Sequence, residues 1–380
     1  MSALIGLGAV AWASRRDVGR SARPAVSVAD LAKAVASPGI APVLDLPAGE
    51  IAATEERLRP AERMNASGYV HALHLFGPSL RTPTGALGDG PVAVADLLLD
   101  VPRAVEMFGG GSILSATRYG LRAPISQESL LGTDQSAAMA HRGQYLAVLG
   151  GLGVAAERPI RLADGSTRPV AALRDDLMAN FALDGEIAWD AVALAYYIVK
   201  PTWTNKFGHV FTFDQLAGEL DSRDPGQASC GGTHDLTALT TLIKVDRLKP
   251  ILSDAGRDRA IAAVSRRVAH VRDAQLGDGS WDLRWHRGAP TGAAGRATSS
   301  PYSSGDSLIV TGHLLEWLIL LPEPLRPEAE VYRRGATWVA AALRAFGDDP
   351  ARVDKLYCPL IHATRSLRLL SRAVEPSVGP

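Results

Sequence analysis

The chain of 380 residues balances 40 basic against 40 acidic side chains, and 47% of its residues are apolar. Such a composition is typical of a globular protein with a sizeable core. Because the net charge is zero, we expect no electrostatic binding to nucleic acid. Two cysteines are too few for a framework of disulfides.

The N-terminus carries an uncharged apolar run, residues 3–13, followed by Arg15 and Arg16. The run is shorter than the roughly 20 residues that a membrane-spanning helix needs. It resembles the apolar part of an export signal, although the basic residues that normally precede that part are missing. An export signal, a short membrane anchor and a helix packed on the domain all stay open. We assign residues 1–24 to a leader and linker and slightly favour an exported or membrane-anchored protein over a cytoplasmic one.

Residues 25–125 contain short apolar segments at helical spacing, such as SVADLAKAVA and YVHALHLFG. Turn sequences such as GALGDGP and FGGGS interrupt them. This pattern predicts an irregular helical N-terminal region that supports the rest of the chain. His71 and His74 lie three residues apart among apolar neighbours, and we assign this pair to packing.

From residue 126 the helical spacing becomes regular. Helices are predicted over 136–152, 168–181, 187–199, 213–220, 234–248, 255–274, 307–321, 329–346 and 355–372. Five of these, the first, third, fifth, seventh and ninth, are apolar on most of their circumference and are therefore buried on most sides. Alternation of buried and half-exposed helices predicts an all-α protein whose residues 126–375 form an α/α toroid, an inner ring of parallel helices inside an outer ring.

Four of the five inner helices have a histidine in or near their first turn: His141, His234, His313 and His362. If the inner helices are parallel, these imidazoles converge at one mouth of the ring. Helix N-termini add unpaired N–H groups and partial positive charge there. A polar mouth on an apolar ring is the default place for a ligand. The alternative is that each histidine satisfies buried backbone groups.

The stretch SCGGTHDL places Cys230 four residues before His234, and Cys358 precedes His362 by the same spacing. Thiolate and imidazole are ligands of zinc, so these four residues form a candidate metal site. The glycines after Cys230 and the proline at Pro359 argue that both cysteines lie ahead of their helices. Two buried, inert cysteines are the alternative.

Without a metal, the sequence favours acid–base chemistry by His234, His313 and Glu316. Glu316 lies three residues after His313, on the same helix face, where it is suited to proton transfer beside an imidazole. Polar or aromatic residues in or near the inner helices are candidates for substrate binding: His141, Gln144, Asp235, Trp203, Asn205, His362 and Trp285. Packing, helix capping or a turn is the alternative for each of these.

The sequence QLGDGSW, Gln275 to Trp281, matches the QxxxGxW signature of turns in terpene cyclases and protein prenyltransferases, which are α/α toroids. The resemblance implies that Gln275 caps a helix end and that Trp281 stacks beneath it. Together with HRGQYLAVL, SCGGTHDL and TGHLLEWL, the motif resembles bacterial proteins with a prenyltransferase and squalene-cyclase-like toroid, over residues 126–370.

That resemblance implies a fold but no activity. The acidic DxDD and DDxxD motifs of cyclases and synthases are missing, and Ala228 stands where prenyltransferases carry the aspartate of their zinc site. We therefore expect an enzyme that uses acid–base residues at the ring mouth on a glycan, a lipid or isoprenoid, or a peptide. The alternative is a non-catalytic ligand-binding or scaffold protein of the cell envelope.

Overall fold

The computed structural model describes residues 26–47, 49–60, 64–88, 90–109, 111–126, 137–288, 304–347 and 349–374. These residues are mostly helical, as predicted, and they also form small two-stranded sheets that the sequence analysis does not predict. Among them no helix is long and apolar enough to cross a membrane. The apolar run at residues 3–13 lies outside the described residues.

The N-terminal helices are short, as the sequence predicts. They are α2 (Val28–Ala36), α3 (Glu50–Arg57), α4 (Ala66–Phe76), α5 (Val94–Leu97) and α6 (Val101–Phe108). Side-chain caps fix several of their starts. The Oδ1 atom of Asn65 accepts from the backbone N–H of Gly68 at 2.7 Å, for example, and so satisfies one of the free donors at the start of α4.

Each helix predicted between residues 136 and 372 overlaps an observed one. The observed helices are α7 (Gln144–Gly151), α8 (Ala171–Ala179), α9 (Ala188–Tyr197), α10 (Phe213–Ser222), α11 (Thr233–Leu248), α12 (Asp254–Asp273), α13 (Ser304–Leu320), α14 (Ala329–Phe346), α15 (Pro350–Lys355) and α16 (Tyr357–Leu370). Helix α7 starts later than predicted because Gly143 has a left-handed backbone, with φ of 73°. A side chain at Gly143 would also meet Asp190, so glycine is required there.

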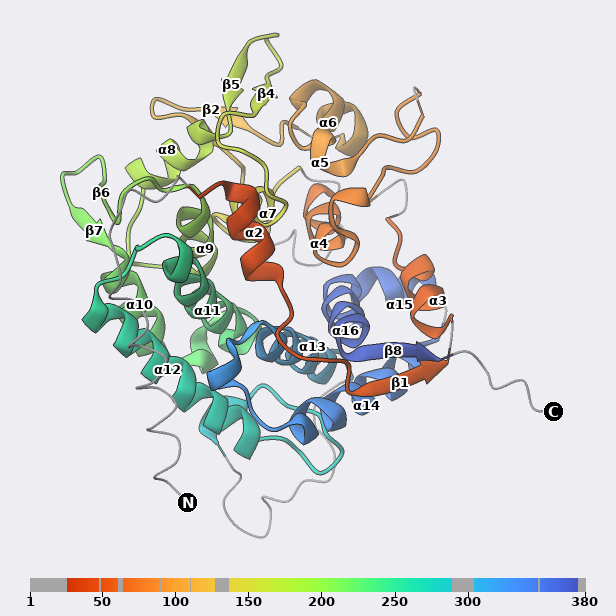
Figure 1. Ribbon diagram of the computed structural model, residues 1–380. Helices are drawn as coiled ribbons and strands as arrows, with labels where there is room; N and C mark the ends of the chain where they lie inside the picture. Colours follow the sequence, from red (N-terminus) through yellow and green to blue (C-terminus); the bar gives the residue numbers. More distant parts are fainter. Residues whose placement is uncertain are drawn as a thin grey trace.

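Short strands that the sequence pattern does not predict also form. Hairpins join β2 (Ser115–Ala116) to β3 (Leu121–Arg122), β4 (Pro159–Arg161) to β5 (Thr167–Pro169), and β6 (Thr202–Thr204) to β7 (Val210–Thr212). A strand of two or three residues is too short to show a period of two against a helical background. The remaining pair is parallel: β1 (Leu44–Pro47) lies beside β8 (Ser371–Val374) and joins segments from opposite ends of the chain (Figure 1).

Six helices contact one another in cyclic order: α4, α7, α9, α11, α13 and α16, with α16 packing against α4 (Figure 1). We call them the helix cycle. Four further helices, α8, α10, α12 and α14, each pack against one or more of its members. Helix α4 therefore completes the cycle from the N-terminal region, which the sequence reading treated as support.

Hydrogen bonds near both ends show that two helices of the cycle, α7 and α9, run in the same direction. The Glu186 carboxylate accepts from His141 and His234 and so brings the starts of α7, α9 and α11 together. At the opposite end, the hydroxyl of Tyr197 on α9 donates to the carbonyl of Val154, just after α7, at 2.8 Å. Helices α7 and α9 consequently run parallel.

Helix α2 lies against α7, α9 and α11, near their C-terminal halves. The ammonium group of Lys244 on α11 ties it there, donating to the carbonyls of Val35, Ser37 and Leu320 at 2.8, 3.2 and 3.1 Å. Desolvation lowers the pKa of Lys244 to about 8. This contact joins α2 to α11 and to the C-terminal end of α13.

The turn QLGDGSW contacts helix α14 through Gln275. The Gln275 side-chain amide donates to the carbonyls of Gly279 and of Val331, near the start of α14, at 2.9 and 3.0 Å. The indole of Trp281 is fully buried and donates to the carbonyl of Val271 at 2.7 Å. The turn after α12 is thereby fixed to the neighbouring helix α14.

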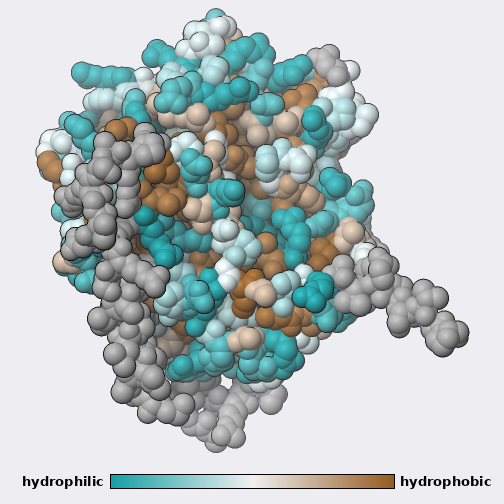
Figure 2. Space-filling model, viewed as in Figure 1, coloured by the Kyte–Doolittle hydropathy of each residue, from teal (hydrophilic) through white to brown (hydrophobic). Residues whose placement is uncertain are grey.

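On the face shown in Figure 2, hydrophilic and apolar residues are interspersed. Large apolar side chains are exposed around the β6–β7 hairpin, where Val199, Phe207 and Val210 are 78%, 70% and 60% exposed. The Lys206 ammonium lies 5.0 Å from the centre of the Phe207 ring.

Candidate functional site

Six imidazole rings lie together inside the helix cycle, and every ring is within 6.4 Å of another, centre to centre. The closest pair is His313 and His362, at 3.8 Å, followed by His141 and His234 at 4.8 Å. His234 and His313 are 5.6 Å apart. The whole set is His71, His74, His141, His234, His313 and His362.

The structure brings the four histidines singled out from the sequence together, but two of them do not begin helices. His313 is the tenth residue of α13, which starts at Ser304. The glycine before it, Gly312, does not mark a helix start. A Cβ atom at Gly312 would lie 2.7 Å from the backbone nitrogen of Ala363, so a glycine there allows α13 to approach α16 closely.

His362 likewise is the sixth residue of α16, and Cys358 is its second. The expectation that Pro359 places Cys358 ahead of the helix is wrong, because proline is tolerated in a first turn, where its missing N–H would have no helical partner. Cys230 does precede its helix, as the glycines after it predict.

The assignment of His71 and His74 to packing missed their neighbours. The ring of His362 lies 5.9 Å from His71 and 5.7 Å from His74. Trp189 of α9, which the sequence reading did not single out, lies 5.2 Å from His234 and 5.7 Å from His74. The sequence does offer one signal of their role, because His71 and His74 are a pair of histidines on one face of an otherwise almost wholly apolar helix.

Backbone carbonyls orient two of the rings. The Nδ1 atom of His71 lies 2.8 Å from the carbonyl oxygen of Ser67, and Nδ1 of His313 lies 2.8 Å from that of Ile309. A carbonyl oxygen only accepts, so Nδ1 carries the proton in both rings. The Nε2 atom of each ring therefore presents a lone pair.

Carboxylates orient three more rings, in each case by accepting a hydrogen bond from Nδ1. Glu186 accepts from Nδ1 of His141 at 2.7 Å and from Nδ1 of His234 at 2.9 Å. Glu316 accepts from Nδ1 of His362 at 2.6 Å. Histidines that bind metals are typically held in this manner, with the second ring nitrogen donating to a carboxylate or a carbonyl.

Several buried polar atoms of this region have no hydrogen-bond partner. They include Nε2 of His313, Nε2 of His74, both amide atoms of Gln144 and the indole nitrogen of Trp189. Burying a polar atom without a partner costs about 1–3 kcal/mol, and native proteins avoid it. The interior of the helix cycle thus has the polar lining of a site for a ligand or an ion.

The thiols of Cys230 and Cys358 both lie close to imidazole rings. The ligand atoms of Cys230, His234 and His313 all lie within 4.8 Å of one another, and so do those of His71, Cys358 and His362. We call these the Cys230 triad and the Cys358 triad. A third group at this spacing, His141, Glu186 and His234, is the hydrogen-bonded arrangement in which Glu186 holds two rings.

Cys230 is held in a strained conformation, with φ of 51°, and is the one non-glycine residue with positive φ in the described part of the chain. Such a backbone costs on the order of 1–3 kcal/mol and is found where surrounding structure enforces it. Here the indole of Trp285 donates to the carbonyl of Gly231 at 2.9 Å, and the Thr233 hydroxyl donates to that of Cys230 at 2.9 Å.

Burial sets the protonation of these groups. Desolvation lowers the pKa of His71 to about 4 and those of His74, His313 and His362 well below their usual value. It raises the pKa of the Cys230 thiol to about 12. Neutral imidazoles are the form that binds metals, whereas a thiol must lose its proton on binding.

Glu316 contacts His362 and Arg365 rather than His313. Its second carboxylate oxygen accepts from Arg365 at 2.9 Å. Asp235 is buried next to His234 in the sequence, and desolvation raises its pKa to about 6, with Arg223 opposing the shift. The acid–base roles predicted for His234, His313 and Glu316 stay predictions.

Trp203 and Asn205, which the sequence predicts to bind substrate, make contacts that stabilise the fold. The ring of Trp203 packs on Phe181 and Phe211, with centres 5.2 and 5.9 Å away. The side chain of Asn205 donates to the carbonyl of Phe181 and accepts from the N–H groups of Phe207 and His209, all within 3.1 Å. These contacts fix the β6–β7 hairpin.

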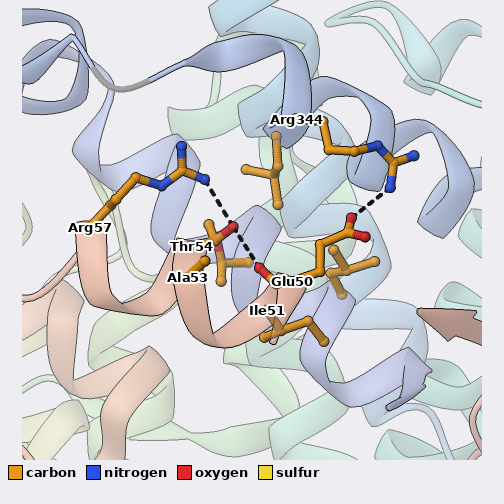
Figure 3. A pocket seen from close by; sticks show the side chains of 9 residues that line it. Glu50, Ile51, Ala53, Thr54, Arg57 and Arg344 are labelled. Carbon is orange, nitrogen blue, oxygen red and sulfur yellow. Dashed lines mark hydrogen bonds and ion pairs between the residues drawn. The ribbon is translucent and has the colours of Figure 1, made fainter. Parts of the chain in front are cut away.

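A separate cavity of about 150 Å³ lies between α3, α14 and α16 (Figure 3). Both arginines at its edge are engaged: Arg57 donates to Thr54 at 3.1 Å, and Arg344 pairs with Glu50 at 2.6 Å (Figure 3). The cavity is lined by Glu50, Ile51, Ala53, Thr54, Arg57, Leu343, Arg344, Thr364 and Leu367.

Comparison of the chain with protein-family models, curated proteins and solved structures found no match.

Proposed function

We propose that this protein is a metalloprotein that binds a transition-metal ion of the zinc class through the Cys230 triad. The observation that carries the proposal is the orientation of the rings: Nδ1 of His234 and Nδ1 of His313 are each held by a protein acceptor. Their Nε2 atoms are thereby left for a metal. One ligand atom each of His234, His313 and Cys230 lie within 4.8 Å of one another. Nε2 of His313 is buried without another partner.

The fold proposed for this site is an α/α toroid. In support, the six helices of the cycle contact one another in order, and α8, α10, α12 and α14 pack against them. In this arrangement the helix cycle is the inner ring and the metal lies within it. The geometry of the QLGDGSW turn supports the same fold.

Three protein ligands leave a fourth position of tetrahedral zinc open to water or substrate, as in catalytic zinc sites. A metal in that state polarises a carbonyl or phosphoryl oxygen and lowers the pKa of bound water. The chain's own residues would keep His234 oriented through Glu186 and would place His141, on the same carboxylate, as a neighbouring proton carrier. We propose that the reaction is hydrolysis of a bond in a glycan, a lipid or a peptide.

The test is the metal content of the purified full-length chain, measured by mass spectrometry before and after chelation and reloading with Zn²⁺. His313→Gln removes a proposed ligand, while His270→Gln changes an exposed histidine of α12. We expect zinc in the wild type and in His270→Gln, and a loss of at least tenfold in affinity in His313→Gln. Wild-type protein that takes up no zinc after reloading would refute the proposal.

A second candidate function is acid–base catalysis without metal, as expected from the sequence. The contact that favours it is the buried network in which Glu316 joins His362 and Arg365. An activity that survives complete removal of metals but is lost in Glu316→Gln would favour this function over the metalloprotein.

A further inference from the structure

The Cys358 triad is a second set of three candidate metal ligands. Its ligand atoms, from His71, Cys358 and His362, lie within 4.8 Å of one another, and it shares no residue with the other triad. Nδ1 of His71 is held by a backbone carbonyl at 2.8 Å and Nδ1 of His362 by a carboxylate at 2.6 Å. Both rings therefore have Nε2 left for a metal.

The two triads are direct neighbours. The rings of His313 and His362, one from each triad, have their centres 3.8 Å apart. Each triad contributes one thiol, from Cys230 or from Cys358. His74 adds a further donor beside His362: its Nε2 atom is buried and has no hydrogen-bond partner.

We propose that the metal centre is binuclear, with a second ion held by His71, Cys358 and His362 and with His74 as its additional ligand. This inference rests on the proposed function of the Cys230 triad. It gives α4 a role in the site, because α4 supplies both His71 and His74.

The charges around the two triads suit two divalent ions. Each ion displaces one thiol proton to solvent, so two ions bring four positive charges and form two thiolates. The carboxylates of Glu186 and Glu316 lie one contact further out and balance the rest. The guanidinium of Arg365 pairs with Glu316.

The experiment is a titration of metal-free, full-length protein with Co²⁺, followed through the cobalt–thiolate absorption band, with equilibrium dialysis counting bound ions. We expect two equivalents for the wild type and for His270→Gln. We expect one equivalent for His71→Gln and for His313→Gln, and about half of the thiolate band in Cys358→Ser, which keeps the imidazoles in place. Circular dichroism and melting curves establish that each variant is folded.

The possible outcomes separate the two proposals. If the wild type binds no ion, both the binuclear centre and the metalloprotein are refuted. If it binds one ion, and binding is lost in His313→Gln but unchanged in His71→Gln and Cys358→Ser, the binuclear centre alone is refuted. Should His71→Gln fail to fold, the wild-type stoichiometry and Cys358→Ser decide the question.

Discussion

Removal of the Glu186 carboxylate tests how the imidazoles are held. In Glu186→Ala both His141 and His234 lose the acceptor that fixes the proton on Nδ1, at 2.7 and 2.9 Å. Each ring is then free to move the proton to Nε2, which removes the lone pair that binds a metal. Loss of such an outer partner typically lowers metal affinity by about 10–100-fold, or about 1.4–2.7 kcal/mol.

The affinity is measured by competition for Zn²⁺ against a chromophoric chelator, in wild type, Glu186→Ala and Glu157→Ala. Glu157 is exposed and serves as the matched control. Glu186→Gln is a useful intermediate, because His141 and His234 bind different oxygens of the carboxylate and the amide NH₂ group that replaces one of these oxygens cannot accept. An affinity in folded Glu186→Ala within about threefold of the wild type would show that the carboxylate does not orient the metal ligands, and would refute this reasoning.

Three further predictions concern stability and the triads. Trp281→Ala removes a fully buried indole with a hydrogen bond to Val271, so urea denaturation should show a loss of about 3–5 kcal/mol; a loss under about 1 kcal/mol would contradict the structural role of the turn. In metal-free protein the pKa of His71 falls from 6.5 unfolded to about 4 folded. The free energy of unfolding therefore has its full value above pH 6.5 and decreases as pH falls through about 4, by at most roughly 3 kcal/mol. In a series of urea titrations, His71→Gln should make the free energy of unfolding depend less on pH over this range. Trp285→Phe removes the hydrogen bond to Gly231, so cobalt titration should show weakened binding at the Cys230 triad and unchanged binding at the Cys358 triad; equal weakening at both would contradict it.

The sequence was sufficient to place the helices that show a clear helical period. Periodicity placed α9, α11, α12 and α14 close to their observed bounds, because a mostly apolar circumference or a single apolar stripe repeats at helical spacing. It could not place β4–β5 or β6–β7, since those strands have three residues each and are fixed by their turns. In the first turn Gly165 has φ of 81°, and in the second Gly208 has φ of 85°.

For the site, the sequence identified four of the six clustered histidines but not the geometry that orders them. The pairing of Glu186 with His141 and His234 joins residues 45 and 48 positions apart, and no local pattern signals it. His71 was assigned to packing because α4 is short and apolar, and its ring neighbour His362 lies far along the chain. Such contacts form only when helices far apart in the sequence pack together in the helix cycle, so no local sequence pattern indicates them.

X-ray absorption spectroscopy of the zinc-loaded, full-length protein tests the central claim most directly, since it reports the atoms bound to the metal. We predict an average of one sulfur at about 2.3 Å and at least two imidazole nitrogens at about 2.0–2.1 Å for each zinc, the distances typical of thiolate and histidine ligands. A first shell of oxygen and nitrogen atoms without sulfur would contradict a metal centre built on Cys230 and Cys358.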